Sequence, residues 1–285
     1  MSLAAQWFGS RAIVMKVIYD FGSNNGDDIP YYLLKADRVV AVEANPLLCE
    51  KIRARFATAL ADGRLIVENC VVTRNISSES VPFYIHRTDH VLSQFDAPTN
   101  GRQIEFEMVH LRSQTASQIV HSHGDPFYIK IDVEGYDSEI LRELFENGIR
   151  PPYISSECHD ISVFALLLSI GEYEAFKLVD GASVSRSYSD YPISTLDGTL
   201  KDISFPFHSA GPFGPDVKGP WMTANNFFRY LAYENLGWKD IHASKIDKPD
   251  ATAAVRIRPY FERALKNKIK AFLKRPFESL RKQDS

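Results

Sequence analysis

The sequence predicts an α/β fold, with a mainly parallel, doubly wound sheet and helices on both of its faces. Two observations favour this fold class. Short apolar runs rich in β-branched residues alternate with helical patterns as far as about residue 180, and such alternation places parallel strands side by side with their connecting helices on the two faces. Hydrophobic residues also make up 45% of the 285 residues, which is enough for one large core.

The predicted elements follow one another in a regular order. Each strand is a short apolar or β-rich run, and each helix has apolar residues at helical spacing. Pro46 suits the first position of its helix and Gly148 closes another. Two runs at 80–86 and 104–111 predict an inserted antiparallel pair. The other strands are expected at 16–21, 38–44, 64–72, 126–133 and 152–157, with helices at 26–36, 46–60, 115–123, 137–148 and 161–170.

The chain is predicted to have three parts. The alternation of strands and helices forms a core over residues 1–182. Residues 183–250 are rich in Pro, Gly, Ser and aromatic residues. Because long loops in compact proteins tend to be functional lids or disordered segments, this loop-rich part is expected to cover the substrate side. Residues 251–285 place apolar residues at helical spacing between basic ones, which predicts a basic C-terminal helix.

The bulk composition argues against several kinds of protein. A net charge of −3 disfavours general nucleic-acid binding. The three cysteines form no C-x-x-C pair, so neither a disulfide framework nor a thiolate zinc site is predicted. No run approaches the ~20 apolar residues that span a bilayer, and no signal-peptide pattern is found. A cytoplasmic protein with reduced thiols is therefore expected.

The turn after the first strand is expected to hold a ligand, because ligands of doubly wound sheets bind beyond the carboxyl ends of the strands. The turn reads Gly22-Ser-Asn-Asn-Gly26. This spacing does not fit the G-x-G-x-x-G of dinucleotide-binding folds, and the lysine of a phosphate-binding P-loop is missing. The carboxylates of Asp20, Asp27 and Asp28 would repel a phosphate. The alternative is a glycine turn that only joins two strands.

Glu43 lies at the end of the second strand, where a ribose-binding acid is expected in such folds. The ligand would then carry a ribose, and the acidic loop favours a neutral or cationic group rather than phosphate. S-adenosylmethionine, with a ribose, an amine and no phosphate, fits this description.

A second stretch, FYIKIDVEGYD from residue 127, carries charged side chains at the end of a central strand. Lys130 and Asp132 face the same side, because strand residues alternate between two faces. Placing these two residues and Glu134 there costs desolvation free energy unless they form pairs or act in catalysis. The alternative to a functional role is an ion pair that locks the turn.

Three motifs together resemble the FkbM family of S-adenosylmethionine-dependent methyltransferases. They are D-x-G-x-N-x-G-D at 20–27, the acid Glu43 followed by Asn45 and Pro46, and K-I-D-V-E-G at 130–135. The resemblance covers residues 16–179, and K-I-D-V-E-G is its most specific part. It implies a Rossmann-like class I methyltransferase fold with a seven-stranded sheet, and O-methylation of a hydroxyl, commonly on a sugar, glycan or polyketide.

The resemblance also implies which residues bind the cofactor. The loop residues should line its methionine end, Glu43 should accept hydrogen bonds from the ribose hydroxyls, and Ser93 matches a family serine near the cofactor. One departure concerns Thr115-Ala116-Ser117, where the family usually has Thr-Leu-Asp. The full cofactor-binding set is Asp20, Gly22, Ser23, Asn24, Gly26, Asp27, Glu43, Asn45, Ser93 and Asp132.

Catalysis is expected to need alignment and a proton acceptor. Methyl transfer from a sulfonium is an in-line displacement, so alignment supplies much of the rate, and an alcohol must lose its proton to a nearby carboxylate or histidine. The same groups could instead hold a divalent cation; acid–base catalysis is favoured over a metal. The catalytic candidates come from two strand ends and are Lys130, Asp132, Glu134, Glu157 and His159.

The expected partners are a hydroxylated small molecule or saccharide acceptor and no nucleic acid. The rings of Phe213 and Trp221 suit the apolar face of a sugar, or else they pack against the sheet. Residues 254–285 hold ten Lys/Arg against three acids. Such a segment suits an anionic membrane surface or an acidic partner, or packing on the chain's own acidic body.

The predicted function is O-methylation of a hydroxyl on a saccharide, glycan or related natural product. The alternative is a catalytically inactive glycan- or nucleoside-binding protein that keeps the fold. Ser117 and the lack of a central glycine in the first loop leave room for that alternative. An NAD-dependent oxidoreductase is disfavoured by the spacing of the loop glycines.

Overall fold

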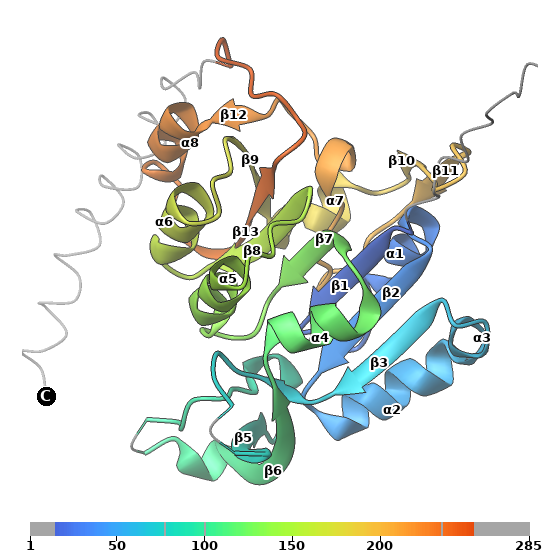
Figure 1. Cartoon of the computed structure of the whole chain (residues 1–285), viewed down its shortest axis with the longest axis vertical. Coiled ribbons are helices and arrows are strands. Elements are labelled where there is room, and N and C mark those ends of the chain that lie inside the picture. The colour runs from blue at the N-terminus through green and yellow to red at the C-terminus, as the bar shows by residue number, and fades with distance from the viewer. Residues whose placement is uncertain (1–14, 77, 100, 235, 254–285) are drawn as a thin grey trace, which may run out of the picture.

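The computed structural model describes residues 15–253 except 77, 100 and 235. Its centre is a sheet with the strand order β12-β9-β13-β8-β7-β1-β2-β3 (Figure 1). The five strands from β8 to β3 pair in parallel, while β13 and β12 pair antiparallel to their neighbours. The strands are β1 Val17–Phe21, β2 Arg38–Glu43, β3 Leu65–Asn69, β7 Pro126–Ile131, β8 Tyr153–Cys158, β9 Ala175–Asp180, β12 Met222–Thr223 and β13 Gly237–Ser244.

Helices cover both faces of this sheet, as predicted. On one face, α4, α5, α6 and α8 pack against side chains such as Phe21 and Ile129. On the other face, α1, α2, α7 and residues 205–221 pack against side chains such as Ile18 and Tyr128. Neighbouring residues of one strand thus belong to different clusters, because a strand alternates its faces. The helices are α1 Ile29–Lys35, α2 Pro46–Arg55, α3 Ala57–Ala61, α4 Ala116–His123, α5 Asp137–Glu146, α6 Ser162–Ser169, α7 Val184–Ser187 and α8 Ala224–Leu231.

The predicted antiparallel insertion is present and stands at the carboxyl end of the sheet (Figure 1). It consists of β5 Ser80–His86 and β6 Phe106–Gln114, with β4 Val71–Val72 pairing parallel to β6. The expected strand over 64–72 is therefore two strands, because the chain leaves the main sheet after β3 and joins the insertion. A small apolar cluster around Val81 and Phe83 packs against Ala44, directly after β2.

Residues 183–250 contribute more to the sheet than their sequence suggested. They include the short hairpin β10 Tyr191–Ser194 and β11 Leu200–Ile203, and also β12, α8 and β13. Strand β13 lies between β8 and β9. The boundary suggested at residue 182 therefore does not coincide with an edge of the sheet. Eight strands, rather than the expected seven, lie in the sheet of the described residues, because the two-residue β12 pairs with β9.

In the described part of the chain, no helix is both long and apolar enough to cross a membrane. The cytoplasmic location stays a prediction. Most of the C-terminal segment predicted as a basic helix, residues 254–285, lies outside the described residues.

Candidate cofactor and catalytic site

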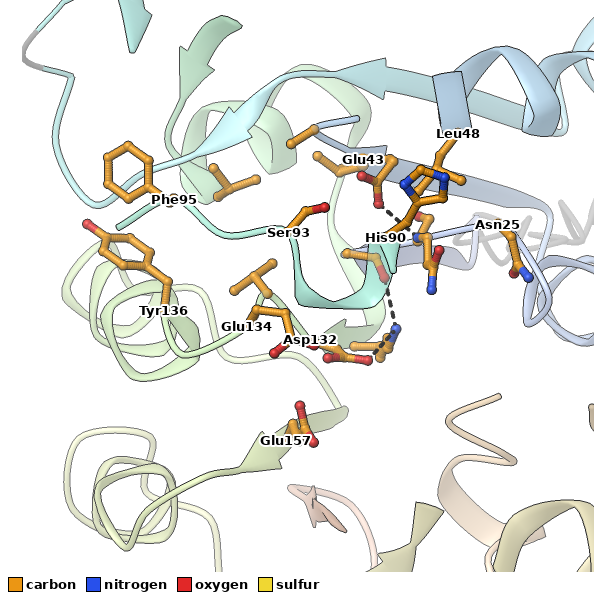
Figure 2. Close-up of a pocket in the computed structure, with 18 of the residues that line it drawn as sticks. Asn25, Glu43, Leu48, His90, Ser93, Phe95, Asp132, Glu134, Tyr136 and Glu157 are labelled. Atoms are coloured by element: carbon orange, nitrogen blue, oxygen red, sulfur yellow. Dashed lines mark hydrogen bonds and ion pairs between the residues drawn. The ribbon is translucent and has the colours of Figure 1, made fainter. Parts of the chain in front are cut away.

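A cavity of about 340 Å³ opens where β1, β2, β7 and β8 end. It is bounded by the loop after β1, by Glu43 at the end of β2, and by the turn after β7. The inserted β4–β6 segment closes another side. Figure 2 shows Glu43 and Glu157 on opposite sides of the cavity, with Asp132 and Glu134 between them. This is the edge at which ligands of doubly wound sheets bind.

The loop after β1 is held against the ends of both neighbouring strands. The amides of Gly22 and Ser23 donate to the carbonyl of Val42 at 2.9 and 3.1 Å. Gly22 has a φ of +83°, and a Cβ there would stand 1.7 Å from the carbonyl oxygen of Asp132. Only glycine therefore fits between β1 and the end of β7. Asn24 has a φ of 47°, a left-handed conformation that asparagine tolerates better than most residues.

Glu43 organises the loop after β1 and the start of α2. Its two carboxylate oxygens accept backbone hydrogen bonds from Asn24 and Asn45, both at 2.8 Å. Burial raises the pKa of Glu43 to about 7, against the opposing effect of these two amides. Asn45 in turn caps α2 by accepting from the amide of Leu47 at 3.0 Å.

Lys130 is buried in the centre of the site and joins three of its parts. Its Nζ lies 3.3 Å from carboxylate oxygens of Asp20 and Asp132, and donates to the carbonyl of Gly22 at 3.1 Å. Burial lowers the pKa of Lys130, but the surrounding carboxylates outweigh burial and hold it well above its usual value. Lys130 is therefore a permanent cation, and the ion pair anticipated as an alternative is present.

Three carboxyl groups in the cavity lining lie close together. One oxygen from each of Asp132, Glu134 and Glu157 lies within 4.8 Å of the others. Strand β7 ends at Ile131, so Glu134 reaches the cluster through a turn with a φ of 45° and not by continuing the strand. The set could hold a divalent cation through oxygen ligands.

His159 is bound to this cluster through Glu157, with 2.9 Å between Nε2 and Oε2. The hydrogen bond with Glu157 raises the pKa of His159 to about 9 against the effect of burial. Burial and the nearby Asp132 and Glu157 raise the pKa of Glu134 to about 8. At neutral pH, His159 is therefore largely cationic and Glu134 largely protonated.

Most of the predicted site residues line the cavity. Among them, Asp27 also pairs with Arg55 at 2.8 Å, and the Ser93 hydroxyl accepts from the amide of His86 at 3.2 Å. The predicted residues in the lining are Gly22, Ser23, Asn24, Asp27, Glu43, Ser93, Lys130, Asp132, Glu134, Glu157 and His159.

Three predicted residues support the cavity from behind instead. Asp20 is 1% exposed and pairs with Lys130. A Cβ on Gly26 would come within about 3 Å of Ile29 and Ile52, so this glycine lets the loop pack on the helices. Asn45 is the cap of α2.

Several lining residues were not found from the sequence; apart from Asn25 and Val133, which lie inside the quoted motifs, they come from segments with no recognisable motif. On the insertion side they include an edge-to-face pair, Phe95 and Tyr136, with ring centroids 5.1 Å apart. The others include Asn25, Leu48, Cys70, Val71, Val72, Phe83, His90, Val133, His208 and Trp238. The position of Cys70 to Val72 at the end of the third predicted strand is the one signal that could have been used.

The aromatic residues expected to bind a sugar are in the core. Phe213 is 1% exposed and stacks on Tyr128 with centroids 4.0 Å apart. Trp221 is 8% exposed and lies under the ammonium of Lys177. Neither residue lines the cavity. That expectation was wrong, and the alternative of packing against the sheet is what occurs.

Comparisons with known proteins agree with the motifs. The family model described as the methyltransferase FkbM domain matches residues 20–178, more than half of the chain. No curated protein matches the sequence.

Solved structures give weaker similarities. A methyltransferase FkbM from Methylobacillus flagellatus KT has 15% identity and a TM-score of 0.38 over 57% of this chain, a match that spans 39% of that protein. The C-terminal domain of precorrin-6Y C5,15-methyltransferase from Rhodobacter capsulatus has 13% identity and a TM-score of 0.35, over 81% of this chain and 79% of that one. A SAM-dependent O-methyltransferase from Thermotoga maritima has 9% identity and a TM-score of 0.35, over 82% and 61%.

Proposed function

Because the chain belongs to the FkbM methyltransferase family, we propose that it is an S-adenosylmethionine-dependent O-methyltransferase acting on a hydroxyl of a saccharide, glycan or related natural product. One observation carries the proposal: a single cavity joins the glycine loop, the acid at the end of β2 and a carboxylate cluster at the ends of β7 and β8. The first two suit the cofactor, and the third suits removal of a proton.

The cofactor fits the chemistry of the cavity wall. Glu43 offers carboxylate oxygens to the ribose hydroxyls, as acids at this position do in related folds. The apolar side chains of Leu48, Val71 and Phe83 suit the adenine ring. At the other end, the backbone of the glycine loop, whose residues line the cavity, suits the ammonium and carboxylate of the methionine part. When bound, S-adenosylmethionine supplies an electrophilic methyl group.

The proton acceptor is assigned by elimination. As the hydroxyl oxygen bonds to the methyl carbon, the carbon–sulfur bond breaks, the sulfur keeps the electron pair, and the hydroxyl proton must leave. His159 is largely cationic and Glu134 largely protonated at neutral pH, and Lys130 is a permanent cation. Both remaining carboxylates are paired, Asp132 with Lys130 and Glu157 with His159, but the Glu157 side chain is only 8% exposed, which leaves Asp132. Its side chain is 34% exposed, so an acceptor can reach it.

A metal-assisted mechanism would use the same carboxylates. A divalent cation between Asp132, Glu134 and Glu157 would orient the hydroxyl and lower its pKa. Acid–base catalysis is favoured, because the charge of His159 already balances part of this cluster. The two mechanisms differ in their response to a chelator.

The test of this function is transfer of a labelled methyl group from S-adenosylmethionine to a panel of methyl glycosides and polysaccharides. Asp132→Asn keeps the shape of the side chain and removes the proton acceptor, so turnover should fall by ~10²–10⁴-fold while S-adenosylhomocysteine affinity is kept. Asp62→Asn, an exposed residue at the end of α3, is the control. Normal turnover by Asp132→Asn would place the base elsewhere, and loss of activity with chelator that Mg²⁺ restores would favour the metal.

Two sequence features left room for an inactive binding protein, and the structure offers a local explanation for each. The backbone amide of Ser117 donates to Glu143 at 3.1 Å and its hydroxyl also donates to that carboxylate. This departure from the family therefore makes a contact from α4 to α5, outside the cavity lining. Asn24 adopts the left-handed conformation that a central glycine would otherwise supply. Neither departure argues for lost turnover.

A further inference from the structure

Three aromatic residues meet at the rim of the cavity on the side of Glu157. The Phe207 and Trp238 ring centroids lie 5.2 Å apart, and the His208 ring is 5.9 Å from Trp238 at an interplanar angle of 29°. Because β13 pairs antiparallel to β8, its first residues, including Trp238, lie at the edge where the parallel strands end. His208 and Trp238 line the same cavity as Glu157 and His159.

This aromatic rim, Phe207, His208 and Trp238, is held in place from two sides. A Cβ at Gly181 would come within 2.4–2.6 Å of the Trp238 indole, so the absence of a side chain there makes the seat for this ring. Directly after His208, the Ser209 hydroxyl and the Ala210 amide donate to the buried Asp28 carboxylate, the latter at 3.1 Å. The loop that carries His208 is therefore fixed to the start of α1.

The rim nevertheless stays accessible to solvent. Phe207 is 55% exposed and Trp238 is 37% exposed, in contrast to the core rings Phe213 and Trp221. Exposed aromatic surface next to a cavity is typical of a ligand-binding wall.

The charges facing the rim select against anions. The carboxylates of Asp28, Asp132 and Glu157 line this cavity together with the largely protonated Glu134. Lys130 and His159 are cations in the same lining, and both are already paired. Lys130 pairs with Asp20 and Asp132, and His159 pairs with Glu157. A phosphate or carboxylate on the acceptor would meet repulsion without a free cation among these residues, whereas hydroxyls can hydrogen-bond to the carboxylates.

We propose that the aromatic rim is the acceptor subsite and binds the C–H face of an uncharged saccharide ring, whose hydroxyl then points toward Asp132 and Glu157. The rim disfavours sugar phosphates and uronic acids. This inference rests on the proposed function, because it names the acceptor for the same site.

Tryptophan fluorescence tests the subsite, with S-adenosylhomocysteine present at saturation. The probes are methyl glycosides of glucose, galactose, mannose and rhamnose, with glucose 6-phosphate and glucuronic acid as anionic counterparts. At least one neutral glycoside should change the fluorescence of the wild type, and the anionic sugars should not. The change should persist in Trp221→Phe, whose ring is buried, and disappear in Trp238→Phe.

Affinity measurements separate loss of the signal from loss of binding. Calorimetry should show that Trp238→Ala lowers the affinity for the responding glycoside by about tenfold or more. Gly181→Ala keeps the indole but displaces it, and should lower the affinity for the same glycoside. Both variants should bind S-adenosylhomocysteine as the wild type does, which also shows that they are folded.

The outcomes distinguish this inference from the proposed function. If S-adenosylhomocysteine binds but no neutral glycoside does, or if Trp238→Ala binds glycosides normally, the acceptor subsite is overturned. Equal binding of the anionic sugars would overturn the charge selection. Failure of the wild type to bind S-adenosylhomocysteine would instead contradict the proposed function itself.

Discussion

Asp137 is a buried carboxyl group at the start of α5, and its Oδ2 atom has no hydrogen-bond partner among the described residues. Burial, together with the charge of Asp132, raises its pKa from 3.8 to about 7. At a pH between these two pKa values, the Asp137 carboxyl group is protonated in the folded state and ionised in the unfolded state. Stability contributed by this group therefore falls as pH rises through that window.

Asp137→Asn should flatten this part of the pH dependence. Urea unfolding at about pH 5 and about pH 8 should show that the wild type loses about 2–3 kcal/mol more unfolding free energy than the variant between the two conditions. Glu43 and Glu134 also have raised pKa values, so the stability of the variant should still change with pH. The test is therefore the difference between the wild type and the variant. Parallel curves for both proteins would refute the assignment.

Residue by residue, the sequence was informative where a motif combines a strand end with a turn. Four site residues could be predicted because each lies at or just after the carboxyl end of a strand, and that end must face the ligand. They are Gly22, Glu43, Lys130 and Asp132. Trp238 could not be predicted, since its place beside Glu157 depends on how β13 inserts into the sheet. Pairing of distant segments leaves no trace in the local pattern.

At the scale of elements, Ser117 links α4 to α5. Glu143 is 4% exposed and accepts from both the amide and the hydroxyl of Ser117 and from Asn147 Nδ2 at 3.1 Å. A buried carboxylate depends on such donors, and losing one is costly.

Ser117→Ala should therefore cost stability and leave cofactor binding alone. The expected loss of unfolding free energy is about 1–3 kcal/mol, with S-adenosylhomocysteine affinity unchanged because Ser117 does not line the cavity. Ser122→Ala, at an exposed position of the same helix, should change the stability little. A large loss of S-adenosylhomocysteine affinity in Ser117→Ala would mean that this position shapes the site.

The elements that could be predicted are those with uniform burial. Strands β1, β2 and β8 are buried along almost their whole length, as is usual in parallel sheets, and such strands appear as continuous apolar runs. Strand β13 has Asp240, His242 and Ser244 as buried polar residues, so its sequence does not resemble a core strand. For this reason β13 could not be recognised within the loop-rich sequence of 183–250.

At the scale of the whole molecule, the cavity lining found within the described residues precedes the basic segment 254–285. We propose that this segment binds an anionic membrane surface or an acidic partner. Ending the chain after residue 253 should leave S-adenosylhomocysteine affinity unchanged and reduce binding to vesicles containing anionic lipids, measured by co-sedimentation. If the full chain ignores such vesicles even at low salt, where screening is weak, the membrane proposal fails.

Calorimetry with S-adenosylhomocysteine measures directly whether the cavity binds the proposed cofactor. The wild type should bind it with a dissociation constant in the low-micromolar to sub-millimolar range and should not bind NAD. Glu43→Ala removes the proposed ribose acceptor and should weaken binding by about 1.5–3 kcal/mol, which is roughly 10- to 150-fold. Glu50→Ala, at an exposed position of α2, should bind normally. If the wild type binds NAD and does not bind S-adenosylhomocysteine, the proposed cofactor and function are wrong.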